Sequence, residues 1–332
     1  MRANLDDLVP RLLERQPRAV ARAISIVEDG GEGQRELVRR LYPHTGKARI
    51  VGITGPPGAG KSTLVDRMAR LCRKRDETVG ILCVDPTSPY TGGAILGDRI
   101  RMQSLYTDPG VFIRSMATRG AMGGLARASR DAVDLLDAAG FDWVLLETVG
   151  VGQDEVDVVR TVDSVVVVTV PGLGDDIQAI KAGILEIADV FVINKADREG
   201  VERAARDLEM MLSLGEHGEW LPPILKTVAS REEGIGEVLA AVERHREHLT
   251  ASGELDKRRR GHLRLRVETI LKERIVAAAD RVLGVEREVE RGFEQRTDPY
   301  RVADRLFSGV LHAEEVAVEA EGVIAPMEER AP

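Results

Sequence analysis

Short apolar runs alternate with longer amphipathic stretches through the middle of the chain. Seven runs are rich in β-branched residues, and we expect each to form a strand: Arg49–Thr54, Thr78–Val84, Val111–Arg114, Trp143–Glu147, Ser164–Val170, Val190–Ile193 and Ile224–Val228. The clearest contains Val165–Val168, since four consecutive valines suit a strand that is buried on both faces. Strands separated by helices form parallel sheets, so we predict an α/β fold with a mostly parallel central sheet flanked by helices.

Helical spacing of apolar residues precedes this region. It runs from about Leu5 to Leu41, with a break at Gly30-Gly31. We therefore predict an N-terminal helical extension over residues 1–46, followed by the sheet-containing domain over residues 47–250.

The β pattern stops after about Thr250, and a charged helical pattern follows over Asp256–Ala279. One stripe of this helix is apolar: Leu263, Val267, Ile270, Leu271 and Ile275. Such a stripe packs against something, and the pattern favours neither the main domain nor a second copy of the chain. We predict a helical, dimerising segment over residues 251–312 and a poorly ordered acidic tail over 313–332.

Composition narrows the class of protein. The chain of 332 residues has a formal net charge of -8, which argues against a nucleic-acid binder. Its two cysteines, Cys72 and Cys83, are too few for a disulfide framework, and we expect both to be buried in a reducing compartment. No stretch approaches the length of a membrane helix or a signal peptide, so we expect a cytoplasmic protein.

A phosphate-binding loop is predicted directly after the first strand. The pattern G-x-x-x-x-G-K-[ST] is fitted by Gly55, Pro56, Pro57, Gly58, Ala59, Gly60, Lys61 and Ser62, and a helical pattern continues from Thr63. Glycines allow the main chain to turn and present N–H donors to phosphate, and the helix N-terminus adds its positive dipole end. Lys61 is expected to reach the β- and γ-phosphates, and Ser62 to hold Mg²⁺.

Carboxylates for the magnesium region stand at the ends of neighbouring strands. Asp85 follows the second predicted strand, Asp98 lies in the glycine-rich stretch after it, and Glu147 closes the fourth strand. Magnesium prefers oxygen ligands and keeps several waters, so these residues with Ser62 make a plausible set of inner and outer ligands. Taken singly, each of the three carboxylates is also compatible with a helix cap or a solvated loop charge.

The four residues that begin at Glu147 have the D/E-x-x-G form of a loop that senses the γ-phosphate. In such a loop the N–H of Gly150 bonds a phosphate oxygen only while that phosphate is present. Gln153 is a candidate for orienting the attacking water, although a glutamine in a surface loop is more often only solvated.

A guanine-reading motif, N-K-x-D, follows the sixth predicted strand as Asn194, Lys195 and Asp197. A carboxylate at Asp197 can accept both the N1 and N2 hydrogens of guanine, whereas adenine leaves this acceptor unpaired. The last predicted strand ends at Ala229-Ser230, where a main-chain N–H is placed to meet the guanine oxygen. Together with the phosphate loop, the motif predicts a P-loop GTPase.

The assembled residues resemble the GTPases associated with methylmalonyl-CoA mutase, which act as G-protein chaperones of cobalamin-dependent acyl-CoA mutases and were formerly described as lysine/arginine/ornithine transport ATPases. The resemblance runs from about Ile50 to Val242 and rests on the strings GITGPPGAGKSTLVD, VDPTSPYTGGAILGDRIRM, GGLARASRDAVDLLDAAGFDWVLLETVGVGQDE and VPGLGDDIQAIKAGILEIADVFVINKAD.

The resemblance implies a homodimeric GTPase whose partner is a cobalamin-dependent acyl-CoA mutase. It implies that Gly172–Lys181 signals the nucleotide state to that mutase, with Asp175, Asp176 and Lys181 as candidate residues, although the family usually has Glu at position 176. From the sequence, Lys181 is equally well explained as a solvated helix lysine. Because no D-x-H-x-x-G signature occurs, we expect any cobalamin to be bound by the partner.

Three other functions remain open from the sequence. A P-loop kinase or ATPase that energises transport would share the phosphate loop. A metal-insertion GTPase would share both motifs, but the six histidines are scattered and do not form a metal cluster. A scaffold with a dead nucleotide site is disfavoured because Lys61, Ser62, Glu147 and Gly150 are all present.

Overall fold

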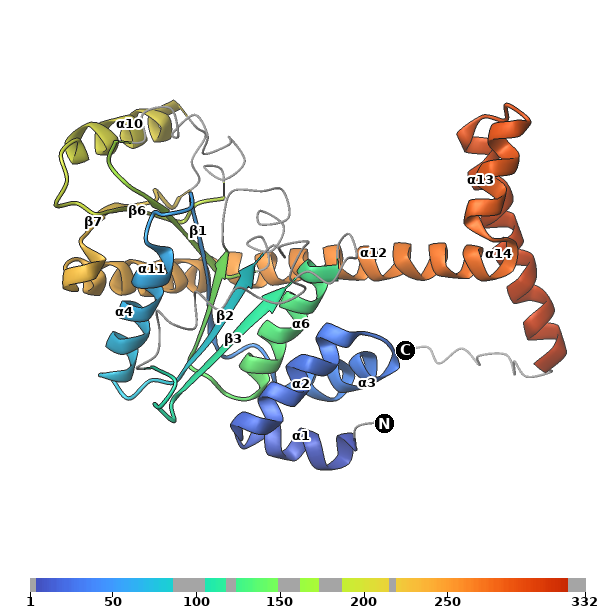
Figure 1. Cartoon of the computed structure of the whole chain (residues 1–332), viewed down its shortest axis with the longest axis horizontal. Coiled ribbons are helices and arrows are strands. Elements are labelled where there is room, and N and C mark those ends of the chain that lie inside the picture. Colours follow the sequence, from blue (N-terminus) through green and yellow to red (C-terminus); the bar gives the residue numbers. More distant parts are fainter. Residues whose placement is uncertain are drawn as a thin grey trace, which may run out of the picture. The chain divides into compact units, whose positions relative to one another are not determined.

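The centre of the protein is a seven-stranded parallel sheet with the order β3-β2-β4-β1-β5-β6-β7 (Figure 1). The computed structural model describes residues 4–85, 105–117, 124–148, 162–172, 187–214 and 219–321. The strands are β1 (Arg49–Thr54), β2 (Val79–Asp85), β3 (Val111–Ala117), β4 (Trp143–Thr148), β5 (Ser164–Thr169), β6 (Val190–Asn194) and β7 (Ile224–Thr227). The predicted α/β fold is therefore confirmed, with small differences at the strand ends.

Two strand ends show what the sequence pattern missed. β3 was expected to end at Arg114, but it continues to Ala117 because its pairing with β2 extends to Asp85. β7 was expected to include Val228, but this residue instead forms an isolated antiparallel bridge with Glu233. In both cases pairing with a neighbouring segment, rather than the local residue pattern, sets the boundary.

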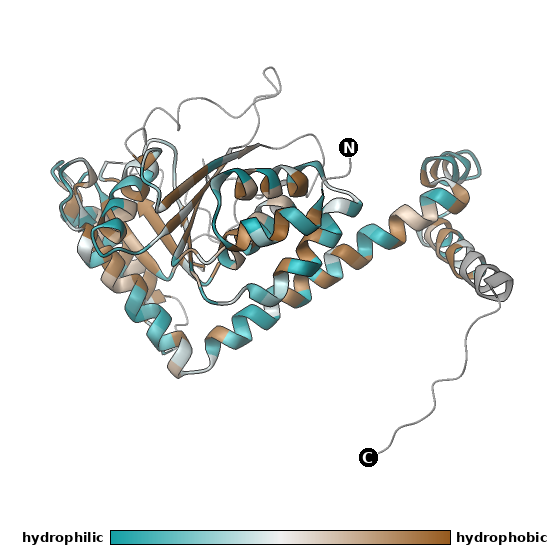
Figure 2. Ribbon diagram, turned by 90° about the horizontal axis from the view of Figure 1, so that it is seen from below, coloured by the Kyte–Doolittle hydropathy of each residue, from teal (hydrophilic) through white to brown (hydrophobic). Residues whose placement is uncertain are grey.

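Two helical layers cover the two faces of the sheet. Helices α4 (Lys61–Arg73) and α11 (Ile235–Ala251) lie on one face, and α6 (Gly124–Ala138) and α10 (Val201–Leu214) on the other (Figure 1). The valine run of β5 serves both faces, because its alternate side chains enter two separate apolar cores. Figure 2 shows the strands as mainly apolar, as expected for a sheet covered on both sides.

The N-terminal extension packs on the α6 side of the sheet. It forms α1 (Leu5–Leu13), α2 (Pro17–Asp29) and α3 (Glu32–Leu41), followed by the 3₁₀ turn η1 (Tyr42–His44). Apolar residues of these helices belong to the same core as α6. The predicted break at Gly30-Gly31 is confirmed, with φ angles of 78° and 85°. A second break was missed, because it uses the non-glycine residue Arg15 at φ 58°.

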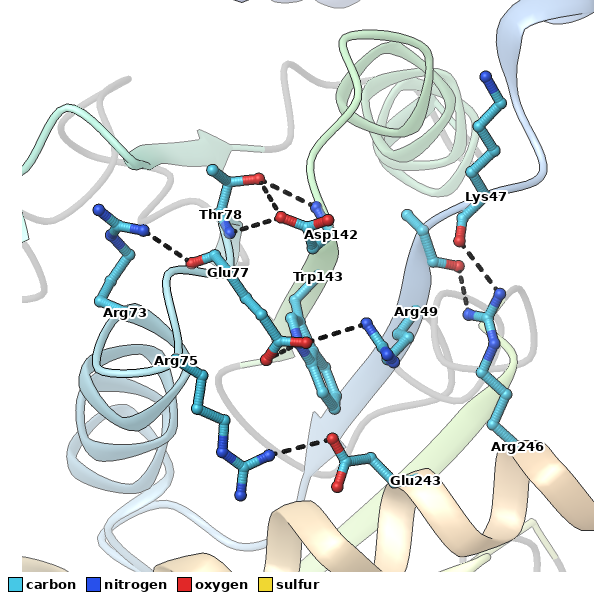
Figure 3. A network of polar contacts seen from close by, with 11 residues as sticks. Lys47, Arg49, Arg73, Arg75, Glu77, Thr78, Asp142, Trp143, Glu243 and Arg246 are labelled. Atoms are coloured by element: carbon cyan, nitrogen blue, oxygen red, sulfur yellow. Dashed lines mark hydrogen bonds and ion pairs between the residues drawn. The ribbon is translucent and has the colours of Figure 1, made fainter.

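A polar network lies at the end of the sheet where strands β1, β2 and β4 begin (Figure 3). Trp143 donates its indole N–H to Glu77 at 3.0 Å, and Arg49 lies over the Trp143 ring at 5.0 Å. Asp142 accepts hydrogen bonds from the N–H and hydroxyl of Thr78, both at 2.7 Å. These residues lie at the N-terminal ends of the strands. The network therefore stabilises this end of the sheet and does not occupy the carboxyl end, where parallel sheets bind ligands.

The C-terminal residues form a second compact unit. The first unit contains Met1–Arg258 and the second Arg259–Pro332, so the boundary falls within α12 (Glu254–Leu283). The second unit also contains α13 (Val285–Glu294) and α14 (Pro299–Glu321). α13 approaches α14 closely at a glycine, since a Cβ on Gly292 would lie 2.6 Å from Val302.

The apolar stripe predicted on α12 is largely solvent-exposed. Its side chains are between 36% and 55% exposed: Leu263, Val267, Ile270, Leu271 and Ile275. Among the residues that the structure describes, no helix is long and apolar enough to cross a membrane.

Candidate nucleotide-binding site

The phosphate loop joins β1 to α4 at the carboxyl edge of the sheet. β1 lies between β4 and β5, so the chain connections diverge here, and parallel α/β sheets bind ligands at such a point. Gly55 has φ 137°, and a Cβ on it would lie 2.0 Å from the Val168 carbonyl oxygen. The loop therefore depends on glycine to pass directly over the end of β5.

The lysine of the loop is buried at the start of α4. Lys61 is 5% exposed, and its Nζ donates to the carbonyl oxygens of Gly55 at 2.7 Å and Pro56 at 3.0 Å. A cation at the N-terminus of a helix is electrostatically unfavourable unless an anion accompanies it. The loop thus concentrates positive potential from the ammonium and the helix dipole, which suits a phosphate ligand.

Ser62 and Glu147 meet beside this lysine. The Ser62 hydroxyl donates to Oε1 of Glu147 at 2.6 Å, and both residues are less than 9% exposed. On the other side of the carboxylate, the Cys83 thiol lies 3.9 Å from Oε2. A hydroxyl and a carboxylate oxygen are the kind of ligands that Mg²⁺ takes, so this pair fits the metal that the sequence predicts.

The other magnesium candidates are less well defined. Asp85 is the last residue of β2, and Asp98 lies outside the described residues. Across the described ranges, no group of three or more His, Cys, Asp or Glu side chains is placed to hold a metal. Magnesium bound together with a nucleotide needs few protein ligands, because phosphates and water supply the rest.

The base-reading motif is tied directly to the phosphate loop. Asn194, at the end of β6, donates its amide to the Ala59 carbonyl at 2.8 Å. Its Oδ1 accepts bonds from the Thr227 hydroxyl and the Ala229 N–H, each at 3.1 Å. A Cβ on Gly60 would lie 2.3 Å from the Asn194 amide nitrogen, so this glycine makes room for the contact.

Two more contacts complete this end of the site. Lys195, in a left-handed conformation at φ 57°, donates its Nζ to the Gly58 carbonyl at 2.8 Å. Asp197 is 37% exposed, and one of its oxygens lies 3.6 Å from Arg231. Of the two residues expected to offer a main-chain donor, Ala229 already bonds Asn194, whereas Ser230 is exposed.

The structure therefore brings together the phosphate loop, Glu147, Asn194, Lys195 and Ala229. Sequence analysis missed Thr227, Cys83 and Arg231, since each lies beside a recognised motif and belongs to none. Six of the predicted residues lie outside the described ranges: Asp98, Gly150, Gln153, Asp175, Asp176 and Lys181.

Comparison with known proteins shows which family this chain matches. Residues 20–282 match the family described as Methylmalonyl Co-A mutase-associated GTPase MeaB. A relative from Pyrococcus abyssi whose name includes the word GTPase is 50% identical over 315 residues, which cover 92% of this chain and 97% of that protein.

Two further relatives extend the comparison. The mouse protein named Methylmalonic aciduria type A homolog, mitochondrial, is 33% identical over 328 residues, covering 91% of this chain and 78% of its own length. The crystal structure of an LAO/AO transport system kinase superposes with a TM-score of 0.72 at 26% identity, covering 94% of this chain and 99% of that chain.

Proposed function

Because the chain belongs to the family of methylmalonyl-CoA mutase-associated GTPases, we propose that it assists the loading, protection or reactivation of a cobalamin-dependent acyl-CoA mutase. The chain is a GTPase, in agreement with the sequence prediction. The observation that carries the proposal is the family match over residues 20–282, which spans the whole candidate site. The mouse relative, whose name refers to methylmalonic aciduria, supports the same partner class.

Within this proposal, the two ends of the site bind the two ends of GTP. The amides of Gly58–Lys61 and the Lys61 ammonium hold the phosphates, and Asp197 accepts the N1 and N2 hydrogens of guanine. The Ser230 N–H is the remaining candidate for the guanine oxygen. A protein with Asp197→Asn should prefer xanthine nucleotides, and unchanged selectivity for GTP would refute this role for the carboxylate.

The proposed metal is magnesium, held by Ser62 with Glu147 close by and with Asp85 and Asp98 as further candidates. When bound, Mg²⁺ neutralises the negative charge that develops on the phosphates during hydrolysis. In this proposal Gly150 senses the γ-phosphate, and Gln153 is the candidate for orienting the attacking water.

The proposed partner contacts involve two further parts of the chain. Asp175, Asp176 and Lys181 are assigned to a segment that reports the nucleotide state to the mutase. We propose that the exposed apolar stripe of α12 is covered by a second copy of the chain, which makes the protein a homodimer. The proposal also places the protein in the cytoplasm and assigns any cobalamin to the mutase.

Single-turnover GTP hydrolysis with and without a purified methylmalonyl-CoA mutase tests the proposal. We expect slow hydrolysis by the protein alone and faster hydrolysis with the mutase, because no motif supplies an arginine to the γ-phosphate. A Lys61→Ala variant is the matched control and should lose tight GTP binding under both conditions. Failure of several cobalamin-dependent acyl-CoA mutases to stimulate the reaction would overturn the partner, and leave the GTPase activity intact.

A transport-energising kinase is the second candidate, favoured by the name of the structural relative at TM-score 0.72. Competition of ATP and GTP against a fluorescent GDP analogue distinguishes the kinase from the GTPase. Displacement by ATP as effective as that by GTP would favour the kinase, whereas the Asp197 carboxylate predicts a strong preference for GTP. A metal-insertion GTPase would instead be indicated by stoichiometric nickel binding.

A further inference from the structure

Two buried hydroxyl groups meet behind the phosphate loop. The Thr148 hydroxyl donates to the Thr54 hydroxyl at 3.0 Å, and the two residues are 0% and 2% exposed. Thr54 is the last residue of β1 and directly precedes Gly55. Thr148 is the last residue of β4 and directly follows Glu147. The bond thus joins the two strand ends from which the phosphate loop and the magnesium-region carboxylate emerge.

This hydroxyl pair lies on the face of the sheet opposite to Glu147. β1 and β4 are parallel neighbours, paired in register as far as Ile53 with Glu147. Because successive side chains of a strand point to opposite faces, Glu147 lies on the α4 face, with Ser62, and Thr148 on the α6 face. The end of β4 is therefore tied on both faces, to Ser62 of α4 through Glu147 on one face and to the end of β1 through the threonine pair on the other.

The hydrogen bond between Thr54 and Thr148 does something that apolar packing at these two positions would not do. A buried hydroxyl without a partner loses its hydrogen bonds to water and gains nothing in return. Valine has the same shape as threonine and is also common in strands, so it could have closed these two strand ends without burying a hydroxyl. Threonine at both positions instead fixes the separation of the strand ends through a directional bond, immediately beside the residue that contacts Ser62.

We propose that Thr54 and Thr148 are positioning residues that hold the Glu147 carboxylate against Ser62 and so set the affinity of the site for Mg²⁺ with GTP. The proposal rests on the proposed function, because it concerns the metal-dependent step of the same nucleotide site. Loss of the tie leaves the phosphate loop and the base-reading motif intact, but it allows the end of β4 to shift relative to Ser62.

The test compares Thr148→Val with Thr148→Ser, which restores a hydroxyl. We expect Thr148→Val to raise the Mg²⁺ concentration for half-maximal GTP binding about fivefold, while the affinity for GDP in EDTA stays as in the wild type. Thr148→Ser should return the Mg²⁺ requirement close to the wild-type value. The double variant Thr54→Val/Thr148→Val should recover stability, since no hydroxyl is left unpaired, yet it should keep the raised requirement.

Ser164→Ala is the matched control for a general loss of stability. Ser164 is 1% exposed, and its hydroxyl bonds His245 at 2.8 Å at the opposite end of the sheet. The Ser164→Ala substitution should lower the urea midpoint of unfolding without changing the Mg²⁺ concentration required for GTP binding. An unchanged requirement in Thr148→Val, or an equal change in Ser164→Ala, would overturn the proposal. Absence of Mg²⁺-dependent GTP binding in the wild type would instead overturn the proposed function itself.

Discussion

The Asn194 side chain donates a hydrogen bond to the Ala59 carbonyl at 2.8 Å, which joins the end of β6 to the middle of the phosphate loop. The same side chain, which is 2% exposed, accepts bonds from Thr227 and Ala229. Hydrogen bonds within the protein therefore join the base-reading and phosphate-binding ends of the site. Such preorganisation lowers the cost of ordering on binding.

Replacing Asn194 with alanine should weaken GDP binding about tenfold to a hundredfold. The change removes the donor to Ala59 and leaves the Thr227 hydroxyl and Ala229 N–H without their acceptor, and each lost hydrogen bond costs about 0.5–1.5 kcal/mol. Titration with a fluorescent GDP analogue measures the effect. Gln34→Ala is the control, because Gln34 is a buried amide that bonds Asp131 far from the site. Wild-type affinity in the Asn194 variant would contradict the prediction.

Alanine substitutions at two glycines of the phosphate loop should lower the stability of the protein to different extents. Gly58 and Gly60 both have positive φ, 76° and 91°, so alanine is strained at either position, by about 1–2 kcal/mol. Only at Gly60 would the new Cβ also collide, 2.3 Å from the Asn194 amide, whereas at Gly58 nothing lies within 4 Å. We expect Gly60→Ala to lower the urea midpoint of the nucleotide-free protein clearly more than Gly58→Ala. Equal urea midpoints for the two variants would show that the loop can move away from the Asn194 amide without loss of stability.

Local patterns predicted the strands, the phosphate loop and the N-K-x-D motif because each is a continuous stretch with its own periodicity or spacing. The valine run of β5 identified a doubly buried strand, and the glycines before Lys61 predicted a phosphate-binding turn. What these patterns could not give is the contact of Asn194 with Ala59, which are 135 positions apart. That contact depends on the spatial order of β1, β5 and β6, which no local pattern records.

The missed features have a common physical origin. Arg15 ends α1 in a left-handed conformation that residues other than glycine adopt only occasionally, so composition gave no signal for the break. Thr54 reads as an ordinary strand residue and Thr148 as an unspecified position of the D/E-x-x-G segment, and only the pairing of β1 with β4 brings their hydroxyls together. Predictions made from one segment at a time therefore recover the elements and the motif residues, and leave out the contacts between them.

Neither cysteine should react with a thiol reagent in the native protein at pH 8. Cys72 and Cys83 are 0% and 1% exposed, as the sequence predicted. Burial, together with the smaller effect of the nearby Glu77, raises the pKa of the Cys72 thiol to about 12, so almost no reactive thiolate forms there at that pH. Titration with a coloured disulfide reagent should detect two thiols in urea and none before unfolding. Rapid native modification of either cysteine would contradict the burial.

The last prediction concerns Asp189, which directly precedes β6 at the opposite end of the strand from Asn194. Its carboxylate accepts the Val165 N–H at 2.9 Å and both terminal nitrogens of Arg258 at 2.9 and 3.0 Å. His245 Nε2 lies 3.1 Å away, without the alignment of a straight hydrogen bond. Burial alone raises the pKa of the Asp189 carboxyl, but His245 and Arg258 more than offset it, so the net direction is downward.

A carboxyl whose pKa is lower in the folded than in the unfolded protein stabilises the fold above its unfolded value of about 3.9, and this stabilisation is lost as the pH falls through the lowered pKa. Asp189→Asn should therefore cost about 3 kcal/mol of unfolding free energy at pH 7, because it leaves Arg258 without its charged partner. The difference between wild type and variant should begin to shrink below about pH 4, where Asp189 of the unfolded wild-type chain takes up a proton, and should be lost as the pH falls through the lowered pKa of the folded protein. Urea unfolding at pH 7, 5 and 3.5 measures it, with Glu202→Gln as a control that removes an exposed ion pair with Lys226. A difference that stays constant over this range would show that the effect of the substitution does not come from the charge of the Asp189 carboxylate.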